Sequence, residues 1–129
     1  MHKTAAMTIN ETAVTPDDLT RLFVARANAG DAAGIAALYE PEAVMAYPPG
    51  EVTVGRDAIR ALWDQVLAKA PAAFEPEAPL PTLVSGGIAL TSTIARDGTG
   101  VRAQVARRQA DGTWLRLLDQ PEIGPPVQR

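Results

Sequence analysis

The hydrophobic pattern of this chain changes its period once, and that change constrains the fold more than any other feature. Up to about residue 70, apolar residues recur every three or four positions, as on one face of a helix. After Gly87, large apolar residues alternate with small or polar ones, as in strands that bury one side. The sequence therefore predicts an α+β fold in which helices come first and hairpin-linked strands follow.

Capping and turn signals delimit three helices. The first begins at Thr-Pro-Asp-Asp, residues 15–18, and ends at Gly30. A second, shorter helix is expected over residues 32–39, capped by the aspartate that precedes it. The third begins at Gly-Arg-Asp, residues 55–57, and ends just before Pro71, since the residue before a proline disfavours helix.

The expected strands are separated by turns that contain Gly, Asp or Pro. A proline-rich passage over residues 74–84 is expected to be a broken edge strand or an extended segment. Residues 15–122 are predicted to form one domain, with a disordered segment at 1–14 and a tail at 123–129. The strands are predicted at residues 43–47, 51–54, 88–95, 101–109 and 113–120.

The composition excludes several functional classes. A net charge of −3 argues against nucleic-acid binding, which needs a basic surface. The chain has no cysteine, and its one histidine, His2, lies near the N-terminus, so no metal and no cofactor are predicted. No apolar run reaches the roughly 20 residues of a membrane-spanning helix, and no signal peptide is recognised. We therefore expect a cytoplasmic protein with neither nucleic-acid nor membrane partners.

Three short segments carry a family resemblance. They are Asn-Ala-Gly-Asp at residues 28–31, Gly-Arg-Asp-Ala-Ile at 55–59 and Asp-Gly-Thr-Trp at 111–114. Their order and spacing resemble the nuclear transport factor 2-like superfamily, which includes ketosteroid isomerases and SnoaL-like polyketide cyclases. The resemblance implies a cone-shaped, cystatin-like fold. In such a fold three N-terminal helices pack on a strongly curved, mainly antiparallel mixed sheet, with a pocket at the wide end.

The resemblance also implies where chemistry would occur. In the isomerases a carboxylate base moves a proton, while a tyrosine and a protonated acid hold the resulting oxyanion. Counted from the Gly-Asp pair, the positions of the base and the tyrosine correspond to Tyr47 and Phe23, and counted back from Gly112 the protonated acid corresponds to Gln104. Phe23 offers no hydrogen bond, and a tyrosine is a poor base at neutral pH. Because all three positions have changed, we expect no steroid isomerisation by that mechanism.

Another acid could replace the missing base. Strand alternation places Leu115, Leu117 and Asp119 on one face of the last predicted strand. If that face is buried, Asp119 points into the cone and could act as a general base. Alternatively, Asp119 is solvated beyond the core edge, or is paired with Arg102 or Arg56. The sequence leaves both readings open.

The combined periodicities predict a mainly apolar pocket with a few polar groups, the usual form of a small-molecule site. Trp63 is either a core residue or a platform for a ligand. Arg102 lies two residues before Gln104, on the same face of the predicted strand, and is expected to point inward. An inward arginine beside an acid resembles the epoxide hydrolases of this superfamily, although their second acid has no counterpart here. The predicted lining is Phe23, Leu38, Tyr47, Trp63, Leu90 and Leu117, with Gln104, Arg102 and Asp119 as the polar groups.

These features predict a protein that handles a small apolar ligand. It would be an isomerase, cyclase or hydratase acting on a carbonyl or hydroxyl compound, with Asp119, Tyr47 and Gln104 as candidate catalytic residues. The alternative is a non-catalytic ligand-binding protein or a dimeric assembly module. A homodimer is expected through the outer sheet face, where the predicted residues are small or β-branched. They are Ala89, Thr91, Thr93, Val101, Ala103 and Val105.

Overall fold

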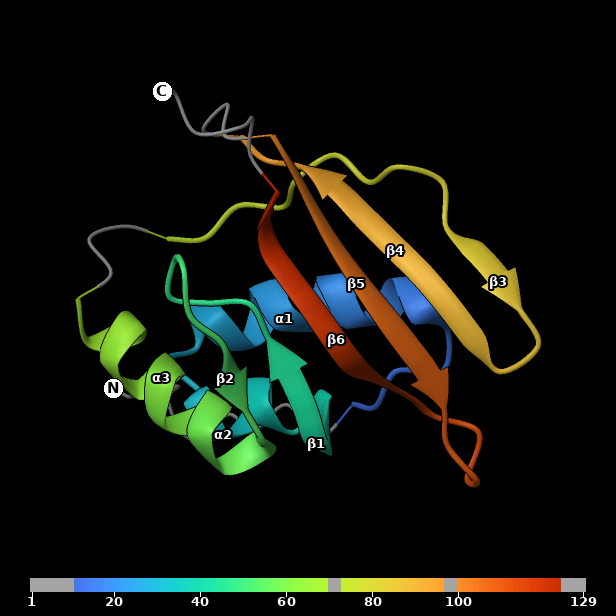
Figure 1. Ribbon diagram of the computed structural model, residues 1–129, viewed down its shortest axis with the longest axis horizontal. Helices are drawn as coiled ribbons and strands as arrows, with labels where there is room; N and C mark the ends of the chain where they lie inside the picture. The colour runs from blue at the N-terminus through green and yellow to red at the C-terminus, as the bar shows by residue number, and fades with distance from the viewer. Residues whose placement is uncertain (1–10, 70–72, 97–99, 124–129) are drawn as a thin grey trace, which may run out of the picture.

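The computed structural model describes residues 11–69, 73–96 and 100–123. Three helices lie against one face of a curved six-stranded sheet with the strand order β2-β1-β6-β5-β4-β3 (Figure 1). β1 and β6 are parallel, whereas the other neighbouring pairs are antiparallel, so the predicted α+β fold with a mainly antiparallel mixed sheet is confirmed. The helices are α1 (Pro16–Asn28), α2 (Ala32–Ala36) and α3 (Arg56–Ala68). The strands are β1 (Tyr39–Met45), β2 (Thr53–Val54), β3 (Leu83–Ser85), β4 (Ile88–Ile94), β5 (Val101–Arg108) and β6 (Trp114–Ile123).

The first residues of the two long helices explain where those helices begin. At α1, the Thr15 hydroxyl accepts from the Asp18 amide, and the Asp18 carboxylate accepts in return from the Thr15 amide. α3 follows Gly55, whose φ of 95° favours glycine. The Arg56 guanidinium donates to the Tyr39 carbonyl from Nε at 2.9 Å and from Nη2 at 2.6 Å. This pair of bonds fastens the start of α3 to β1.

The segment between α2 and β1 differs from the prediction. The helix predicted over residues 32–39 ends earlier, and β1 already begins at Tyr39. The cause is pairing with β6, because the Arg116 amide donates to the Leu38 carbonyl at 2.8 Å. Pro41 has no amide hydrogen to offer, and the β1–β6 register is irregular on its C-terminal side. Tertiary pairing has here overridden a local helical pattern.

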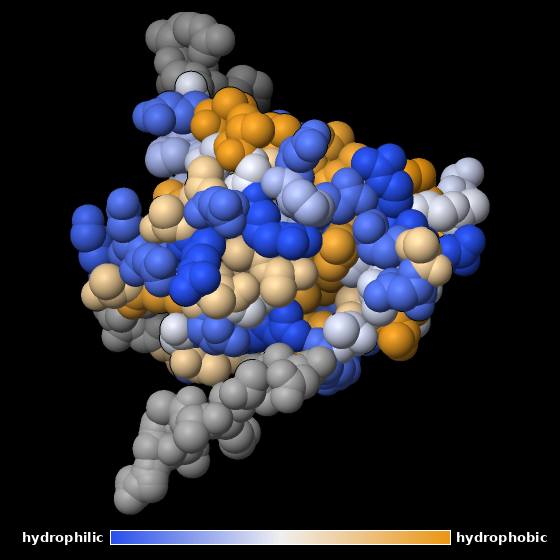
Figure 2. All heavy atoms as spheres, turned by 90° about the horizontal axis from the view of Figure 1, so that it is seen from below, coloured by the Kyte–Doolittle hydropathy of each residue, from blue (hydrophilic) through white to orange (hydrophobic). Residues whose placement is uncertain are grey.

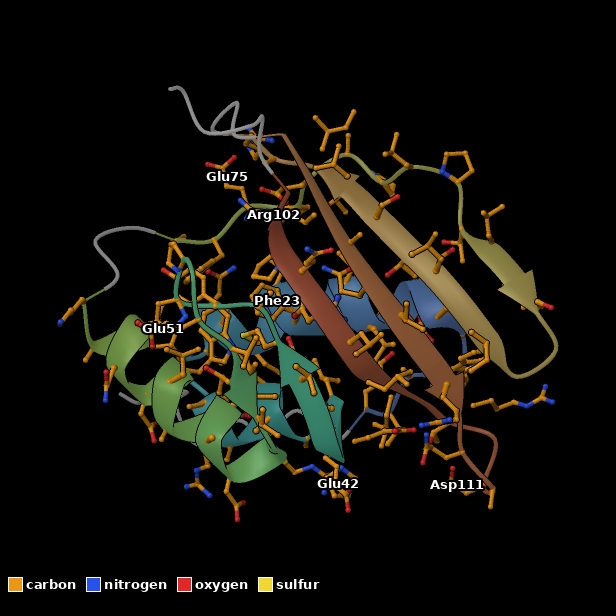
Figure 3. The ribbon with its side chains drawn as sticks, in the orientation of Figure 1. Phe23, Glu42, Glu51, Glu75, Arg102 and Asp111 are labelled. Atoms are coloured by element: carbon orange, nitrogen blue, oxygen red, sulfur yellow. The ribbon has the colours of Figure 1, made fainter. Side chains whose placement is uncertain are left out.

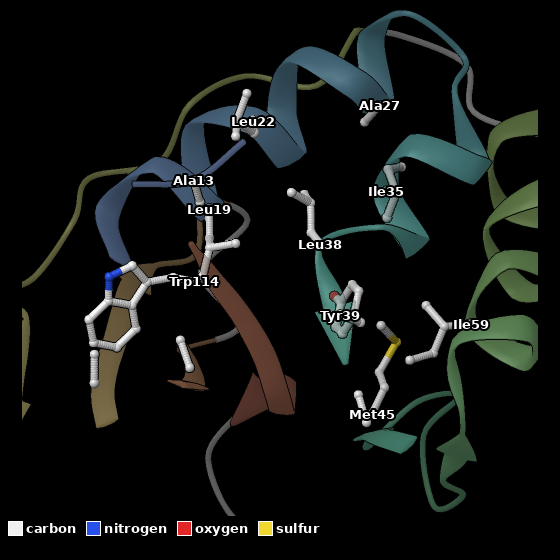
Figure 4. Packing of buried hydrophobic residues seen from close by; sticks show 13 residues of the cluster. Ala13, Leu19, Leu22, Ala27, Ile35, Leu38, Tyr39, Met45, Ile59 and Trp114 are labelled. Atoms are coloured by element: carbon white, nitrogen blue, oxygen red, sulfur yellow. The ribbon is translucent and has the colours of Figure 1, made fainter. Parts of the chain in front are cut away.

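The hydrophobic core fills the space between the helices and the concave side of the sheet (Figure 4). Its largest fully buried side chains come from all three helices and from β1. Each of them stabilises the fold by about 1.5–3 kcal/mol relative to an exposed position. They are Leu19, Leu22, Ile35, Tyr39, Met45 and Ile59.

Part of the N-terminal segment belongs to this core. Disorder was predicted for residues 1–14. Residues 1–10 lie outside the part of the chain that the structure describes. Ala13, however, is 2% exposed, and its carbonyl accepts from the Trp114 amide at 2.9 Å. Glu11 also forms an ion pair with Arg21 of α1. The structure therefore places residues 11–14 against the core and α1.

The two faces of β4 are the reverse of the prediction. Ala89, Thr91 and Thr93 are at most 4% exposed and face the helices, whereas Leu90 is 41% exposed on the outer face. The concave side of a curved sheet offers less room than the convex side, and α1 lies against β4, so small side chains fill that space. The inward orientation expected of Leu90 is thus wrong. Three predicted outer residues of β5 do share the face of Leu90: Val101, Ala103 and Val105.

The surface alternates between charged regions and apolar patches. Seen from below, the molecule presents mostly hydrophilic side chains, with apolar ones gathered in patches between them (Figure 2). On the outer sheet face, large apolar side chains remain exposed, including Leu118 at 48% and Ile94 at 49%. No helix within the described ranges is both long and apolar enough to cross a membrane.

Candidate functional site

A cavity of about 230 Å³ lies between α1, α3 and the concave face of the sheet. Its walls are mostly apolar, and its charged and amide groups come from β5, β6 and the extended segment before β3. This combination is typical of small-molecule sites. The apolar walls include Phe23, Val24, Met45, Leu62, Trp63 and Val66. The charged and amide groups are Glu77, Arg102, Gln104, Arg116 and Asp119.

An aromatic cluster forms one wall. Phe23 and Trp63 meet edge to face with their ring centroids 5.1 Å apart, and Phe74 lies about equally far from both, at 6.3 and 6.2 Å. The Asn28 side chain holds the backbone of Phe74 through two hydrogen bonds, of 2.9 and 2.7 Å. The buried indole nitrogen of Trp63 has no hydrogen-bond partner among the described residues. Trp63 therefore both packs against the core and lines the cavity.

Asp119 is the carboxylate at the inner end of the cavity, and it is only 6% exposed. The Tyr39 hydroxyl donates to Oδ2 at 2.5 Å, and the Gln104 amide donates to Oδ1 at 3.3 Å. The Thr91 hydroxyl in turn donates to Oε1 of Gln104 at 2.9 Å and so fixes the orientation of that amide. The carboxylate keeps further lone pairs, since each oxygen can accept more than one hydrogen bond.

The buried Tyr39 hydroxyl keeps its proton and so remains a hydrogen-bond donor to this carboxylate. Burial raises the pKa of Tyr39 far above its ordinary value, and the negative charge of Asp119 raises it further. The positive charge of Arg116 opposes this rise without cancelling it. Tyr39 consequently stays protonated at physiological pH and continues to donate.

A bulge in β6 brings Arg116 and Asp119 to the same side. The pairing with β5 shifts register between Arg116 and Leu118, which makes Leu117 the extra residue. Asp119 therefore faces inward as predicted, but together with Arg116. Leu115 and Leu117 are only half-buried, and neither lines the cavity.

Arg116 is the residue that sequence reasoning missed. Its side chain is 3% exposed, and its Cζ lies 5.8 Å from the ring centre of Phe23 and 5.9 Å from that of Tyr39. Nη2 donates to the Thr20 hydroxyl at 3.3 Å, and Nη1 lies 4.0 Å from Oδ2 of Asp119. Regular alternation places Arg116 outward, and nothing in the local sequence signals the bulge that reverses it.

A second ion pair occupies another part of the lining. Arg102 binds Glu77 through two bonds, of 2.8 and 3.1 Å, and also donates to the Pro121 carbonyl at 2.6 Å. Burial alone would raise the pKa of Glu77, but bonds from Arg102 and from the Arg96 amide outweigh it, so the pKa lies below its ordinary value. Figure 3 shows Arg102 at the end of the sheet far from Asp111 of the β5–β6 turn. Arg102 thus points inward as predicted, with Glu77 rather than Asp119 as its partner.

Six of the nine predicted pocket residues line the cavity: Phe23, Tyr47, Trp63, Arg102, Gln104 and Asp119. The other three do not. Leu38 is 2% exposed within the core, Leu90 lies on the outer face, and Leu117 occupies the bulge. The lining also contains polar side chains that were not predicted, namely Thr20, Glu77, Thr93 and Arg116. No group of three or more potential metal-binding side chains occurs in the part of the chain that the structure describes.

The curved mixed sheet, the helices on its concave side and the mainly apolar cavity define a nuclear transport factor 2-like, cystatin-like protein. The sequence profile of the SnoaL-like domain matches residues 20–116, and the chain belongs to that family. A comparison with curated proteins finds no match.

Solved structures support the same fold. A protein of Thiobacillus denitrificans, named for a calcium/calmodulin-dependent protein kinase type II association domain, is 21% identical, with a TM-score of 0.69 over 87% of this chain and 98% of its own. A ketosteroid isomerase-like protein of Erwinia carotovora atroseptica is 17% identical, with a TM-score of 0.68 over 91% and 100%. A Streptomyces avermitilis protein, named as a dehydratase of the NTF2-like family, is 15% identical, with a TM-score of 0.61 over 84% and 94%. At these identities the likeness concerns the fold alone.

Proposed function

We propose that this protein is a small-molecule enzyme that removes a proton next to a carbonyl group, with Asp119 as the general base. The observation that carries the proposal is a buried carboxylate, held in place by Tyr39 and Gln104, that opens into a mainly apolar cavity. A base needs a fixed position within reach of the proton that it removes. The two donors fix Asp119, and the apolar walls exclude water from around it.

The proposed reaction class includes isomerisation, cyclisation and dehydration. All three can begin with loss of a proton next to a carbonyl. The names of two structurally similar proteins, a ketosteroid isomerase-like protein and a dehydratase, agree with such a class. Steroid isomerisation in the usual manner is not part of the proposal, because Phe23 and Tyr47 stand at the positions of the oxyanion tyrosine and the base.

The cavity volume supports a compact ligand. A space of about 230 Å³ is smaller than that of most drug-sized pockets. The edge-to-face rings of Phe23 and Trp63, inclined by 70°, form an angled apolar wall against which one or two fused rings can pack. We therefore propose an apolar carbonyl compound of about that size as the ligand.

The test is the exchange of α-protons for deuterium in heavy water, followed by NMR on small apolar ketones such as β-tetralone and phenylacetone. The wild-type protein should accelerate the exchange, and Asp119→Asn should remove the acceleration because an amide cannot accept the proton. Asp111→Asn in the β5–β6 turn is the matched control and should keep the wild-type rate. Tight ketone binding without exchange would favour a non-catalytic ligand-binding protein.

The alternative of a dimeric assembly module also has an observation in its favour. A shallow hollow on the outer sheet face is lined by apolar side chains, among them Leu90, Val105 and Leu118. Soluble monomers seldom expose large contiguous apolar patches. We propose a homodimer through this face as a property that accompanies the enzymatic function.

A further inference from the structure

Arg116 is a buried cation whose hydrogen-bonding capacity is largely unused. A guanidinium carries five N–H donors, yet Nε of Arg116 has no partner among the described residues. One bond of 3.3 Å joins Nη2 to Thr20, and Nη1 lies 4.0 Å from Asp119, beyond an ordinary hydrogen bond. Buried polar groups are normally satisfied. Because Arg116 also lines the cavity, a ligand oxygen could satisfy it.

The guanidinium has a fixed place beside the apolar wall. It lies against the rings of Phe23 and Tyr39, with centroid distances of 5.8 and 5.9 Å. Phe23 lines the cavity and meets Trp63 edge to face. A ligand ring packed against Phe23 and Trp63 would therefore bring an attached oxygen towards Arg116.

The charges around the cavity indicate which kind of oxygen fits. Arg116 stands 4.0 Å from Asp119, and Arg102 is paired with Glu77, so each cation has an anion beside it. A ligand carboxylate would add an unbalanced negative charge to a buried site, which is unfavourable. A neutral carbonyl compound leaves the charges balanced. It also keeps them balanced during proton transfer, because negative charge then moves from Asp119 to the ligand oxygen.

We propose that Arg116 binds the carbonyl oxygen of a neutral ligand and stabilises the negative charge that this oxygen acquires when Asp119 removes an α-proton. In this step the C–H bond breaks and its proton goes to the Asp119 carboxylate. The C–H electron pair forms a carbon–carbon double bond, and the carbonyl π pair moves to oxygen. Arg116 exchanges one anionic neighbour for another, as a preorganised electrostatic site does. The assignment rests on the proposed function and adds a second catalytic residue to it.

The test uses para-nitrophenol as a neutral compound that can place a negative oxygen on a ring. Its phenol and phenolate forms absorb differently, so absorbance reports which form is bound. The Asp119→Asn variant has a neutral side chain at this position, as the protein has after proton transfer. It should prefer the phenolate and lower the pKa of bound para-nitrophenol by about one unit, a roughly tenfold preference. In this background Arg116→Gln should abolish the preference, and Arg116→Lys should retain part of it. The wild-type protein should show a weaker preference, because its Asp119 carboxylate repels the phenolate.

Arg107→Gln is the matched control, since Arg107 forms an exposed ion pair with Glu40 on the outside of the protein. It should leave the phenolate preference unchanged. If Arg116→Gln does not fold, as judged by circular dichroism, Thr20→Val replaces it. That change removes the bond from Nη2 and should reduce the preference without removing the charge.

Two results would overturn the assignment. One is an Asp119→Asn variant that binds para-nitrophenol as the neutral phenol, or does not bind it up to its solubility limit. The other is a folded Arg116→Gln variant that keeps the phenolate preference. The two catalytic roles can be tested separately. Loss of α-proton exchange in Asp119→Asn tests Asp119 as the base, whereas the phenolate preference tests Arg116 as the binder of the negative oxygen.

Discussion

Tyr39 shows how one residue connects the fold to the proposed site. It is fully buried, begins β1 and donates to Asp119, but it does not line the cavity. Its carbonyl also holds Arg56 at the start of α3. A single residue thus links the first strand, the last strand and the third helix, through the hydrogen bonds of its side chain to Asp119 and of its carbonyl to Arg56.

Replacing this tyrosine should lower the stability of the protein. Tyr39→Phe keeps the ring but leaves one oxygen of the buried Asp119 without its donor, which should reduce the free energy of unfolding by about 1–3 kcal/mol. Urea unfolding at neutral pH measures the loss. Tyr47→Phe is the control, because the Tyr47 hydroxyl makes no hydrogen bond within the described part of the chain. A loss from Tyr39→Phe no larger than that from the control would mean that the bond to Asp119 contributes little.

At the residue scale, the sequence could predict several polar side chains of the cavity, but not the way in which their neighbours on the same strand point. Asp119 and Gln104 face the cavity as predicted, but strand alternation assigned Asp119 to the face of Leu117, which does not line it. The β6 bulge turns Asp119 inward and brings Arg116 with it. A bulge depends on the pairing of two strands, so a local pattern of alternation does not reveal it.

The extended segment before β3 is the element that completes the cavity. It runs along β4, where the Leu80 amide donates to the Ser92 carbonyl at 2.9 Å and the Ile94 amide donates to the Ala78 carbonyl at 3.0 Å. Its Glu77 binds Arg102 of β5. The sequence predicted a broken edge strand or an extended segment here because prolines remove amide donors. It could not predict that this segment supplies an acid to the site, since that depends on its register against β4.

The Glu77–Arg102 pair should make stability depend on pH. The folded pKa of Glu77 lies below its ordinary value of 4.5, so its contribution is present at neutral pH and is lost as pH falls through the folded pKa. Glu77→Gln should therefore destabilise the protein at pH near 7 by up to about 1 kcal/mol, since the pair is partly solvent-screened. The difference in the free energy of unfolding between Glu77→Gln and the wild-type protein should become smaller at acid pH.

Urea unfolding of the wild-type protein and of Glu77→Gln, at neutral pH and at a pH well below the ordinary pKa of Glu77, measures this dependence. Glu42→Gln on β1 is the control for loss of a carboxylate, because Glu42 is exposed and makes no ion pair with described residues. A Glu77→Gln deficit that stays constant down to acid pH would contradict the linkage.

For the whole molecule, the helix-then-strand order was predictable because it follows from periodicity over long stretches of sequence. The orientation of β4 was not, because the curvature of the sheet decides that small residues such as Ala89 face inward and Leu90 faces outward. The outer face is consequently more apolar than predicted. It carries Leu90, Ile94 and Leu118 in addition to the three β5 residues.

We expect this face to pair two copies of the chain. Light scattering at micromolar concentration should give twice the monomer mass of 13.6 kDa. Leu118→Lys should shift the mass to that of the monomer, because a charge would be buried at the centre of the apolar face. Val84→Lys, an exposed position on the edge strand β3 whose partner Ala89 lies on the opposite face of the sheet, is the control and should leave the dimer intact. A wild-type monomer would contradict the expected interface.

The central claim is that Asp119 is the base of a proton-transferring site, and α-proton exchange on β-tetralone tests it most directly. The rate with the wild-type protein, above that of the buffer alone, is compared with the rate for Asp119→Asn at the same protein and ketone concentrations. The substitution should lower the protein-dependent rate by roughly a hundredfold or more, while circular dichroism shows an intact fold. A folded Asp119→Asn variant that exchanges the α-protons as fast as wild type would contradict it.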